Sequence, residues 1–305
     1  MRLAIQNLAI QGLPSSARDA AALAGRLGVP FHEIGIHPFP DGEMRVTVGP
    51  AAETTIVYAS LDRPNEKLIA LMFATEALRR GGARRLVLVA PYLCYMRQDI
   101  AFTQGEAISQ RVVGGLLARC FDRVVTVDAH LHRTPDIAAV FPGIESDNLS
   151  AMPAIADALR KTGIDPATVV VGPDAESLPW VRDLAGRLGL PHAVATKTRR
   201  GDRSVAIEFG DTACIAGRPV IIVDDIVASG GTIVACARAL TAAGATAIDV
   251  VVTHALFPEQ ASRDMLAAGI RSIRSTRSVP HATNAIALDD LFIDALKGEL
   301  TEPPS

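Results

Sequence analysis

The chain has 305 residues, of which 49% are hydrophobic and 21% are charged, which is the composition of an ordinary globular protein with about two domains. Thirty Lys and Arg residues against thirty-three Asp and Glu residues give a formal net charge of -3. This excludes the overall basic field of proteins that bind nucleic acid non-specifically, and no apolar run approaches the roughly 18 to 20 residues of a membrane span.

Three short runs rich in β-branched and apolar residues predict strands in the first half of the chain, at residues 56–60, 85–90 and 123–128. Between them, near residues 66–80 and 106–119, apolar residues recur at helical spacing. Strands that alternate with helices in this way are typical of βαβ units, in which helices cover both faces of a parallel sheet.

The second half repeats the alternation. Strands are predicted at residues 169–172, 219–224 and 248–253, and helices near residues 177–188 and 231–244. Gly244 ends the second of these helices, because glycine readily adopts the left-handed conformation that closes a helix.

The two halves resemble a weak internal repeat. We align residues 86–91 with 169–173 and residues 124–128 with 220–224, since in each pair an apolar strand ends in a polar segment. The alignment predicts an α/β fold of two duplicated domains, each a mainly parallel sheet flanked by helices, which meet near residue 148. Ligands of such sheets bind beyond the carboxyl ends of the strands, so the residues that follow each strand are the candidates for chemistry.

Two segments of the first half are candidates for ligand binding. Residues 39–43, Phe-Pro-Asp-Gly-Glu, place an aromatic ring and two acids around a glycine before a strand, although Pro-Asp-Gly by itself predicts only a turn. Beyond the strand at 85–90, Arg97 offers a planar fork of donors that can hold phosphate, and Gln98 adds amide donors. A solvated surface side chain is the alternative for Arg97.

Polar groups that follow two other strands are candidates for metal binding. Asp128 and His130 end the strand at 123–128, where a carboxylate, water and substrate phosphate oxygens would suit magnesium. A histidine by itself would favour zinc or a plain hydrogen bond, but no cysteine spacing supports a zinc site. Asp174 follows the strand at 169–172, with a serine-capped helix start as the alternative.

Four cations lie close together at residues 197–203, Lys-Thr-Arg-Arg-Gly-Asp-Arg, on a predicted hairpin that follows a strand near 192–196. Clusters of this kind are often only solvated. Their position between Asp174 and Asp224 nevertheless places them among the other polar motifs of the second half.

Residues 223–232, Val-Asp-Asp-Ile-Val-Ala-Ser-Gly-Gly-Thr, carry the most specific signal. Gly230 and Gly231 allow the backbone to approach an oxyanion, and Ser229, Thr232 and the first amides of the following helix can donate hydrogen bonds to it. The stretch therefore predicts a phosphate site at the start of a helix, with a capped helix after an acidic turn as the alternative.

The two acids of the same stretch predict a different contact. Asp224 and Asp225 accept hydrogen bonds when they are ionised. They therefore suit the vicinal hydroxyls of a ribose rather than its phosphate.

This stretch resembles the loop shared by type I phosphoribosyltransferases and phosphoribosyl diphosphate (PRPP) synthetases. The resemblance implies that residues 228–232 bind the 5-phosphate and that Asp224 binds ribose hydroxyls. Ala228 departs from the acid or serine of many members, so only its amide can donate. The resemblance adds Arg199 from the 197–203 segment to this site. The residues that it implies for ribose 5-phosphate binding are Arg199, Asp224, Asp225, Ala228, Ser229, Gly230, Gly231 and Thr232.

The other motifs resemble PRPP synthetases in particular. The resemblance implies that residues 39–43 contact the adenine and ribose of ATP, commonly across a subunit interface, and that residues 97–98 complete this site. The ATP-binding residues so implied are Phe39, Asp41, Gly42, Glu43, Arg97 and Gln98.

The same resemblance identifies the metal and catalytic residues. It assigns His130 and Asp174 to magnesium sites, with Asp128 as a further candidate, and Lys197 and Arg199 as the two catalytic cations. Around Asp174, Glu176 and Ser177 replace the usual glycine pair.

Together the motifs resemble the ribose-phosphate pyrophosphokinase, or PRPP synthetase, family over residues 1–280. The resemblance implies transfer of the β,γ-diphosphoryl group of MgATP to the anomeric hydroxyl of ribose 5-phosphate, giving PRPP and AMP. It implies an ATP-contacting phosphoribosyltransferase-like domain at 1–147, a ribose-5-phosphate-binding one at 148–285, and a C-terminal helix and polar tail at 286–305. It also implies a homo-oligomer that is built from dimers, and a hexamer is one such assembly.

Two other functions remain as alternatives. A phosphoribosyltransferase would not need the segments at 39–43 and 97–98, and a catalytically silent regulatory homologue would be expected to lose some of the cations and metal residues. The chain contains neither G-x-x-x-x-G-K-[ST] nor G-x-G-x-x-G, which argues against a P-loop kinase and a dinucleotide-binding dehydrogenase.

Cysteine usage bears on the compartment. Four widely spaced cysteines include no C-x-x-C pair, and the first residues do not resemble a secretory leader, so we expect a cytoplasmic protein with reduced thiols. The four are Cys94, Cys120, Cys214 and Cys236.

Overall fold

A computed structural model describes residues 7–131, 133–200, 204–210 and 212–300, with the side chains of residues 197–206 outside the description. The chain divides into two units. The first comprises the described residues up to Leu149 together with those from Leu288 onward, and the second runs from Ser150 to Ala287. Within the described residues, no helix combines the length and the apolar character needed to span a membrane.

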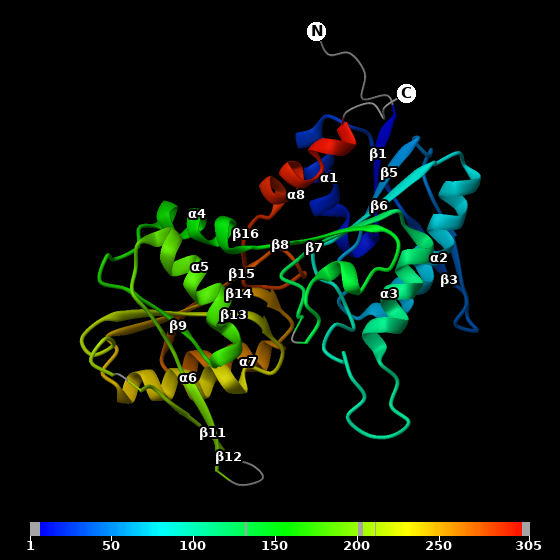
Figure 1. The fold of residues 1–305 in the computed structure, drawn as a ribbon. Helices are drawn as coiled ribbons and strands as arrows, with labels where there is room; N and C mark the ends of the chain where they lie inside the picture. Colours follow the sequence, from blue (N-terminus) through cyan, green and yellow to red (C-terminus); the bar gives the residue numbers. More distant parts are fainter. Residues whose placement is uncertain (1–6, 132, 201–203, 211, 301–305) are drawn as a thin grey trace. The chain divides into compact units, whose positions relative to one another are not determined.

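The first unit is built on a six-stranded sheet in which each pair of neighbours is parallel (Figure 1). The order is β2-β1-β5-β6-β7-β8, with β1 at Leu8–Gly12, β2 at Phe31–Glu33, β5 at Thr54–Tyr58, β6 at Arg85–Ala90, β7 at Arg123–Val127 and β8 at Glu145–Leu149. The helices are α1 at Ala17–Leu27, α2 at Pro64–Arg80, α3 at Ser109–Cys120 and α8 at Asp289–Ala295, with short 3-10 turns η1 at Pro14–Ser16, η2 at Ile137–Ala139 and η4 at Lys297–Leu300.

The second unit has the same plan. Its parallel order is β10-β9-β13-β14-β15-β16, with β9 at Val169–Gly172, β10 at His192–Val194, β13 at Pro219–Val227, β14 at Ala247–Ala255, β15 at Ile270–Thr276 and β16 at Asn284–Ile286. The helices are α4 at Met152–Thr162, α5 at Leu178–Leu188, α6 at Gly231–Ala242 and α7 at Glu259–Ala267, with a 3-10 turn, η3, at Ala175–Ser177.

Apolar residues of strands and helices close the core of each unit. Val57 and Leu88 of the first sheet and Leu71 of α2 are fully buried in one cluster. Val220 and Ile222 of β13 are equally buried in the cluster of the second unit, to which α6 and α7 also contribute. Strands covered on both faces must be apolar along their length, which is why apolar runs in the sequence predict β5, β6, β7, β9, β13 and β14. β1, β8 and β15 were not predicted from the sequence.

An antiparallel hairpin interrupts each unit at the same place. β3 at Gly35–Pro38 and β4 at Met44–Thr47 follow the second strand of the first unit, and β11 at Thr196–Arg200 and β12 at Ser204–Glu208 follow the second strand of the second unit. The matching strand order and the matching hairpins agree with the predicted duplication.

The alignment of the two halves that we made from the sequence is wrong. In strand order, β9 occupies the place of β1, whereas the alignment of residues 86–91 with 169–173 equates β9 with β6, whose counterpart is β14. Likewise β13 corresponds to β5 and not to β7. The error has a physical cause, because buried parallel strands all read as similar apolar runs.

A cluster of ion pairs fastens the segment from Leu288 onward to the sheet of the first unit. Glu299 on η4, with a side chain that is 5% exposed, receives hydrogen bonds from Arg85 Nε at 2.7 Å and Arg123 Nη1 at 2.9 Å. Arg85 also makes a bidentate contact with Glu145, and Arg123 bonds to Asp147 at 2.7 Å. These contacts tie the first residues of β6, β7 and β8 to the last described turn.

We expect Glu299 to make stability depend on pH. Burial by itself raises the pKa of Glu299, but the hydrogen bonds from Arg85 and Arg123 outweigh it and lower the pKa below its ordinary value. The folded state therefore binds fewer protons than the unfolded state. The stabilisation is present above the unfolded pKa of about 4.3 and is lost as the pH falls through the folded value.

Glu299→Gln should lower the free energy of unfolding at pH 7 by about 1–3 kcal/mol, because the lost hydrogen bonds join charged groups. It should also flatten the decline in stability below about pH 5. Thermal unfolding between pH 3 and pH 7 measures both effects. Glu76→Gln, which removes an exposed pair with Arg80, is the control and should change little. Parallel pH curves for Glu299→Gln and wild type would contradict the prediction.

Candidate functional site

In the second unit, β13 leads directly into α6 through the segment 228–230. The strand is longer than the predicted 219–224, because it stays paired with β14 as far as Val227 opposite Ala255. Asp224 and Asp225 therefore lie within the strand and not in a loop. The sheet fixes their backbone at its carboxyl edge, where ligands of such sheets bind.

The segment between β13 and α6 has the geometry of an anion site. Gly230 is the N-cap of α6 with φ 78°, a left-handed conformation that glycine adopts without strain. Ala228, Ser229 and Gly231 are exposed or nearly so at this end of the helix, whereas Gly230 is buried. The first amides of the 12-residue helix α6 thus begin at an accessible surface, as phosphate binding requires.

Gly230→Ala should destabilise this segment, and its neighbour supplies a matched control. A Cβ on Gly230 would lie 3.2 Å from Ala261 Cβ, and its φ is positive, so we expect a loss of about 1–2 kcal/mol in unfolding free energy. A Cβ on Gly231 would meet only Ser229 Oγ at 3.8 Å. Thermal denaturation should therefore separate Gly230→Ala from Gly231→Ala, and equal melting temperatures would contradict the argument.

Three carboxylates gather at the carboxyl edge of this sheet. β9 and β13 are neighbours, and Asp174 follows β9. Burial raises the pKa of Asp224 well above its ordinary value, and the charges of Asp225 and then Asp174 raise it further. The structure thus brings Asp174 close enough to Asp224 for their charges to interact. Asp174 Oδ1 also accepts from Glu176 N at 3.1 Å, so it caps η3 as well.

These carboxylates fit a hard divalent cation. Repulsion between close acids is relieved when a cation binds between them, and oxygen ligands are what Mg²⁺ prefers. Among the described residues, no group of three or more His, Cys, Asp or Glu side chains is arranged to hold a metal by itself.

Lys197 and Arg199 lie on β11, opposite Ile207 and Val205 of β12. The backbone forms the hairpin that the sequence predicts. The side chains of both residues lie outside the described part of the structure, as do Asp202 and Arg203.

In the first unit, residues 39–43 form the tip of the β3-β4 hairpin. Phe39 N donates to Glu43 O at 2.7 Å, Gly42 N donates to Phe39 O at 3.0 Å, and Asp41 Oδ1 accepts from Glu43 N at 3.1 Å. Gly42 has φ 92°, which the tight tip requires. Phe39 is 40% exposed, and its ring packs edge-on against His37, with the ring centroids 5.2 Å apart.

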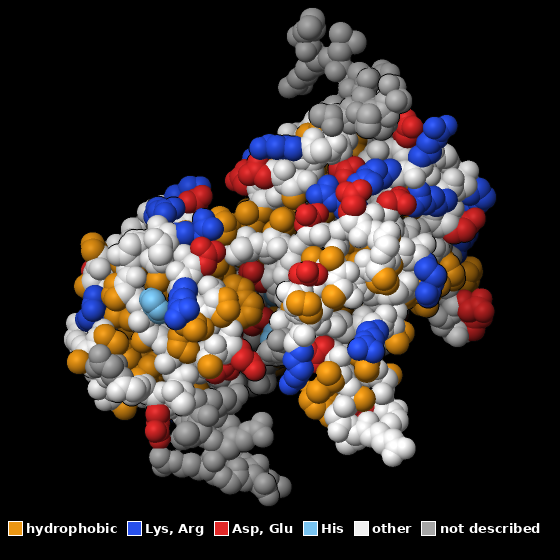
Figure 2. Space-filling view, viewed as in Figure 1, with side chains coloured by type: hydrophobic (Ala, Val, Ile, Leu, Met, Phe, Trp, Pro, Cys, Tyr) orange, Lys and Arg blue, Asp and Glu red, His pale blue; other side chains and the backbone are white. Residues whose placement is uncertain are grey.

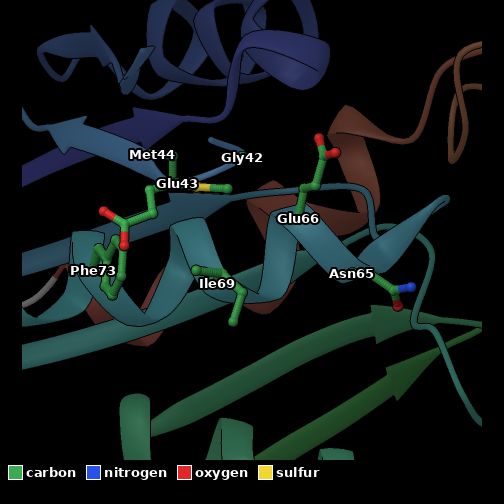
Figure 3. A pocket seen from close by; sticks show the side chains of 7 residues that line it. All are labelled: Gly42, Glu43, Met44, Asn65, Glu66, Ile69 and Phe73. Carbon is green, nitrogen blue, oxygen red and sulfur yellow. The ribbon is translucent and has the colours of Figure 1, made fainter. Parts of the chain in front are cut away.

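A cavity of about 500 Å³ opens beside this tip (Figure 3). Hairpin and helix line it together, and its lining residues are Gly42, Glu43, Met44, Asn65, Glu66, Ile69 and Phe73. Sequence reasoning missed the four from α2. Asn65, Ile69 and Phe73 recur every four residues on one face of α2, but this spacing by itself does not show that the face stays open. Ile69 and Phe73 are more than 40% exposed.

Arg97 and Gln98 lie in the segment between β6 and α3. Arg97 is exposed and Gln98 is half-buried. The Gln98 amide lies 3.4 Å from both Glu106 Oε2 and Ser109 Oγ. Tyr95, in the left-handed region with φ 62°, donates to Asn65 Oδ1 and so connects this segment to the lining of the cavity.

Asp128 and His130 follow β7. Asp128 is buried and has φ 39°, a strained conformation of order 1–3 kcal/mol that tends to occur at functional sites. Its amide donates to Leu149 O at 2.8 Å, and Ala129 N donates to Asn148 Oδ1 at 2.8 Å. His130 is half-buried.

Basic and acidic side chains are interspersed over the face shown in Figure 2. This agrees with the net charge of -3. Anionic ligands would therefore be held by local groups, such as the amides before α6.

Family models match both halves of the chain. Residues 8–120 match the N-terminal domain of ribose phosphate pyrophosphokinase, and residues 149–288 match the phosphoribosyl transferase domain.

Whole-length relatives agree. The chain is 34% identical to ribose-phosphate pyrophosphokinase 2 of Archaeoglobus fulgidus, over 92% of this chain and 97% of that one. It is 32% identical to the ribose-phosphate pyrophosphokinase of Methanothermobacter thermautotrophicus, over 94% and 99%. Its fold matches the phosphoribosylpyrophosphate synthetase of Mycobacterium smegmatis with a TM-score of 0.82 and 25% identity, covering 96% and 98% of the two chains.

Proposed function

The chain belongs to the ribose-phosphate pyrophosphokinase family, and from this premise we propose that it synthesises PRPP from ATP and ribose 5-phosphate. The β,γ-diphosphoryl group of MgATP passes to the anomeric hydroxyl of the sugar, and AMP is released. The observation that carries this conclusion is that both halves are present, since a fold match covers 96% of the chain and the N-terminal family domain is matched over residues 8–120.

Ribose 5-phosphate binds at the carboxyl edge of the second sheet. The amides of residues 228–232 and the hydroxyls of Ser229 and Thr232 hold the 5-phosphate at the start of α6. Asp224 and Asp225 accept hydrogen bonds from the ribose hydroxyls. The accessibility of Ser229 and the left-handed Gly230 support this assignment.

ATP binds through the first unit. Phe39 stacks on the adenine, the backbone and acids of residues 41–43 contact the nucleoside, and Arg97 and Gln98 hold the phosphates. The exposed ring of Phe39 and the exposed Arg97 support these roles. If the hairpin reaches a neighbouring subunit, a homo-oligomer with a dimer as building block is needed for a complete site, and a hexamer is one such assembly.

Magnesium is the proposed cofactor. Asp174 of the second unit would hold it at one site, and His130 with Asp128 of the first unit at another; when bound it would neutralise charge on the diphosphoryl group. Lys197 and Arg199 add positive charge to the same group as it moves, and they help to position it in line with the attacking hydroxyl. The enzyme works in the cytoplasm, where ATP and reduced thiols are available.

The alternatives are not favoured. A phosphoribosyltransferase would not require the N-terminal domain matched at residues 8–120. A silent homologue would be expected to lack functional residues, whereas Lys197, Arg199, His130 and Asp174 are all present.

Incubation of the purified protein with MgATP and ribose 5-phosphate tests the proposal. We expect AMP and PRPP in equal amounts, and no product when a chelator removes magnesium. Absence of AMP above a control without sugar would overturn the proposed function.

A further inference from the structure

Two segments that the proposed function uses leave neighbouring strands of the first sheet. The segment after β6 carries Arg97 and Gln98, and the segment after β7 carries Asp128 and His130. β6 and β7 are paired in parallel, with Ala90 opposite Thr126. Both segments therefore start at the same edge of the sheet, but the pairing of β6 with β7 ends at Ala90 and Thr126, before either segment reaches its functional residues.

An ion pair beyond the sheet connects the two segments. Asp99, next to Gln98, has a side chain that is 2% exposed. Its Oδ2 accepts from the backbone N of Arg133 at 3.1 Å, and its Oδ1 accepts from Arg133 Nη1 at 3.0 Å. Both oxygens of a buried carboxylate are thus satisfied by one residue of the other segment, which fixes direction as well as distance.

A second contact runs in parallel with the first. Thr134 Oγ1 donates to Gln110 Oε1 at 2.9 Å. Gln110 is buried, its Nε2 donates to Met96 O at 3.4 Å, and its backbone N donates to Gln98 O at 3.2 Å. Met96 and Asp99, which lie on either side of Arg97 and Gln98, are therefore both connected by hydrogen bonds to the segment after β7.

The energetic consequence is unequal for the two partners. Arg133 has a side chain that is 54% exposed, with its guanidinium 5.8 Å from the Phe102 ring, so it can be hydrated if the pair breaks. Asp99 cannot, and a buried carboxylate without its partner is strongly unfavourable. Loss of the Arg133 side chain removes the donor to Asp99 Oδ1 and keeps only the backbone donor to Oδ2. It should therefore displace Asp99 and, with it, the adjoining Gln98 and Arg97.

We propose that Asp99 and Arg133 are positioning residues. They hold the segment with Arg97 and Gln98, which binds ATP, at a fixed position relative to the segment with Asp128 and His130, which binds the metal. This inference rests on the proposed function, because that function supplies the roles of Arg97, Gln98, Asp128 and His130. Neither Asp99 nor Arg133 needs to touch a substrate. Their effect is to set where the phosphate ligands lie relative to the metal residues.

A double-mutant cycle tests the proposal, with Asp99→Asn, Arg133→Gln and the two combined. Each single variant should raise the KM for ATP and the half-saturating magnesium concentration by roughly tenfold, the size of coupling expected for contacting groups. The KM for ribose 5-phosphate should stay unchanged. The double variant should be no worse than either single variant, and Arg133→Lys should restore most of the loss because it returns the charge.

Calorimetry gives the MgATP dissociation constant of each variant in the same cycle, and this measurement does not require turnover. Arg80→Gln, which breaks an exposed pair on α2, is the control and should match wild type. Melting curves show whether each variant folds. If Asp99→Asn or Arg133→Gln does not fold, the cycle is repeated with the charge-preserving variants Asp99→Glu and Arg133→Lys.

Additive effects in the cycle, or equal increases in the KM of both substrates, would overturn the positioning role. Additivity would instead mean that Arg133 binds phosphate directly or acts alone. Failure of the wild type to release AMP would count against the proposed function, whereas additivity in an active wild type would count against this inference only.

Discussion

Replacing Lys197 with alanine should lower kcat for PRPP synthesis by about 10²- to 10³-fold, the loss typical of removing one preorganised charge or donor from a transition state. The reason is electrostatic, because the moving diphosphoryl group spreads negative charge over several oxygens and little covalent chemistry is required of the protein. Steady-state release of AMP at saturating ATP and ribose 5-phosphate measures the effect. The backbone pairing of Lys197 with Ile207 does not depend on the side chain, so the fold should be unaffected.

Arg200→Ala is the matched control for this experiment. Arg200 lies on the same strand and carries the same charge, but the family resemblance assigns only Lys197 and Arg199 as catalytic cations. It should retain most of the activity. Near-normal turnover in Lys197→Ala, or an equal loss in Arg200→Ala, would remove the specific role of Lys197 and leave a general effect of positive charge.

Asp224→Asn should lower kcat/KM for ribose 5-phosphate by about 10- to 100-fold, because a hydrogen bond to a charged acceptor contributes about 1.5–3 kcal/mol. The same change should raise the melting temperature of the ligand-free protein. Burial, then the charges of Asp225 and Asp174, raise the pKa of Asp224, so the ionised side chain destabilises the fold at neutral pH. Initial rates and thermal unfolding measure the two effects.

The sign of the pH dependence follows from linkage. A folded-state pKa above the unfolded value means that the folded protein binds the extra proton, so the contribution of Asp224 to stability is fully present below the unfolded pKa. It declines as the pH rises through the folded one. An amide in place of this carboxyl cannot titrate, so the Asp224→Asn variant should lack this decline. A lower melting temperature for the variant at pH 7 would contradict the argument.

Asp249 provides the opposite case in the same unit. Burial by itself raises its pKa, but hydrogen bonds from Arg271 and Ser272 outweigh burial and lower it. Asp249→Asn should therefore reduce stability at neutral pH while leaving catalysis intact. The pair of variants separates an aspartate kept for ligand binding from one kept for the fold.

Much of the fold was predictable because the strands are covered on both faces and read as apolar runs. The glycines at 230 and 231 also predicted a helix start correctly, since α6 begins at Gly231; the binding of ribose 5-phosphate at this segment is a proposal. The alignment of the halves failed for the same reason that the strands were easy to find. One buried parallel strand looks like another, and only the pairing order distinguishes β9 from its neighbours.

Contacts between distant side chains were not predictable in this way. Nothing in the sequence indicates that Arg133, among many arginines, would satisfy Asp99 across 34 positions. The α2 lining of the cavity was missed because its apolar residues have ordinary helical spacing, and spacing does not show which face stays open. The predicted end of β13 at Asp224 is too early, because Asp224 and Asp225 lie within the strand, which continues to Val227.

The ion pairs of Glu299 with Arg85 and Arg123 have a consequence for synthesis on the ribosome. Residues from Leu288 onward belong to the first unit, and the whole second unit lies between them and Leu149. In a nascent chain that folds from its N-terminus, the first sheet would form before Glu299 is synthesised. Arg85 and Arg123 would then lack the Glu299 carboxylate until the second unit had emerged. Translation of the first unit thus begins before that of the second unit but ends after it. In a chain truncated before Glu299, the sheet around Arg85 and Arg123 would lack these ion pairs and be more exposed to proteases.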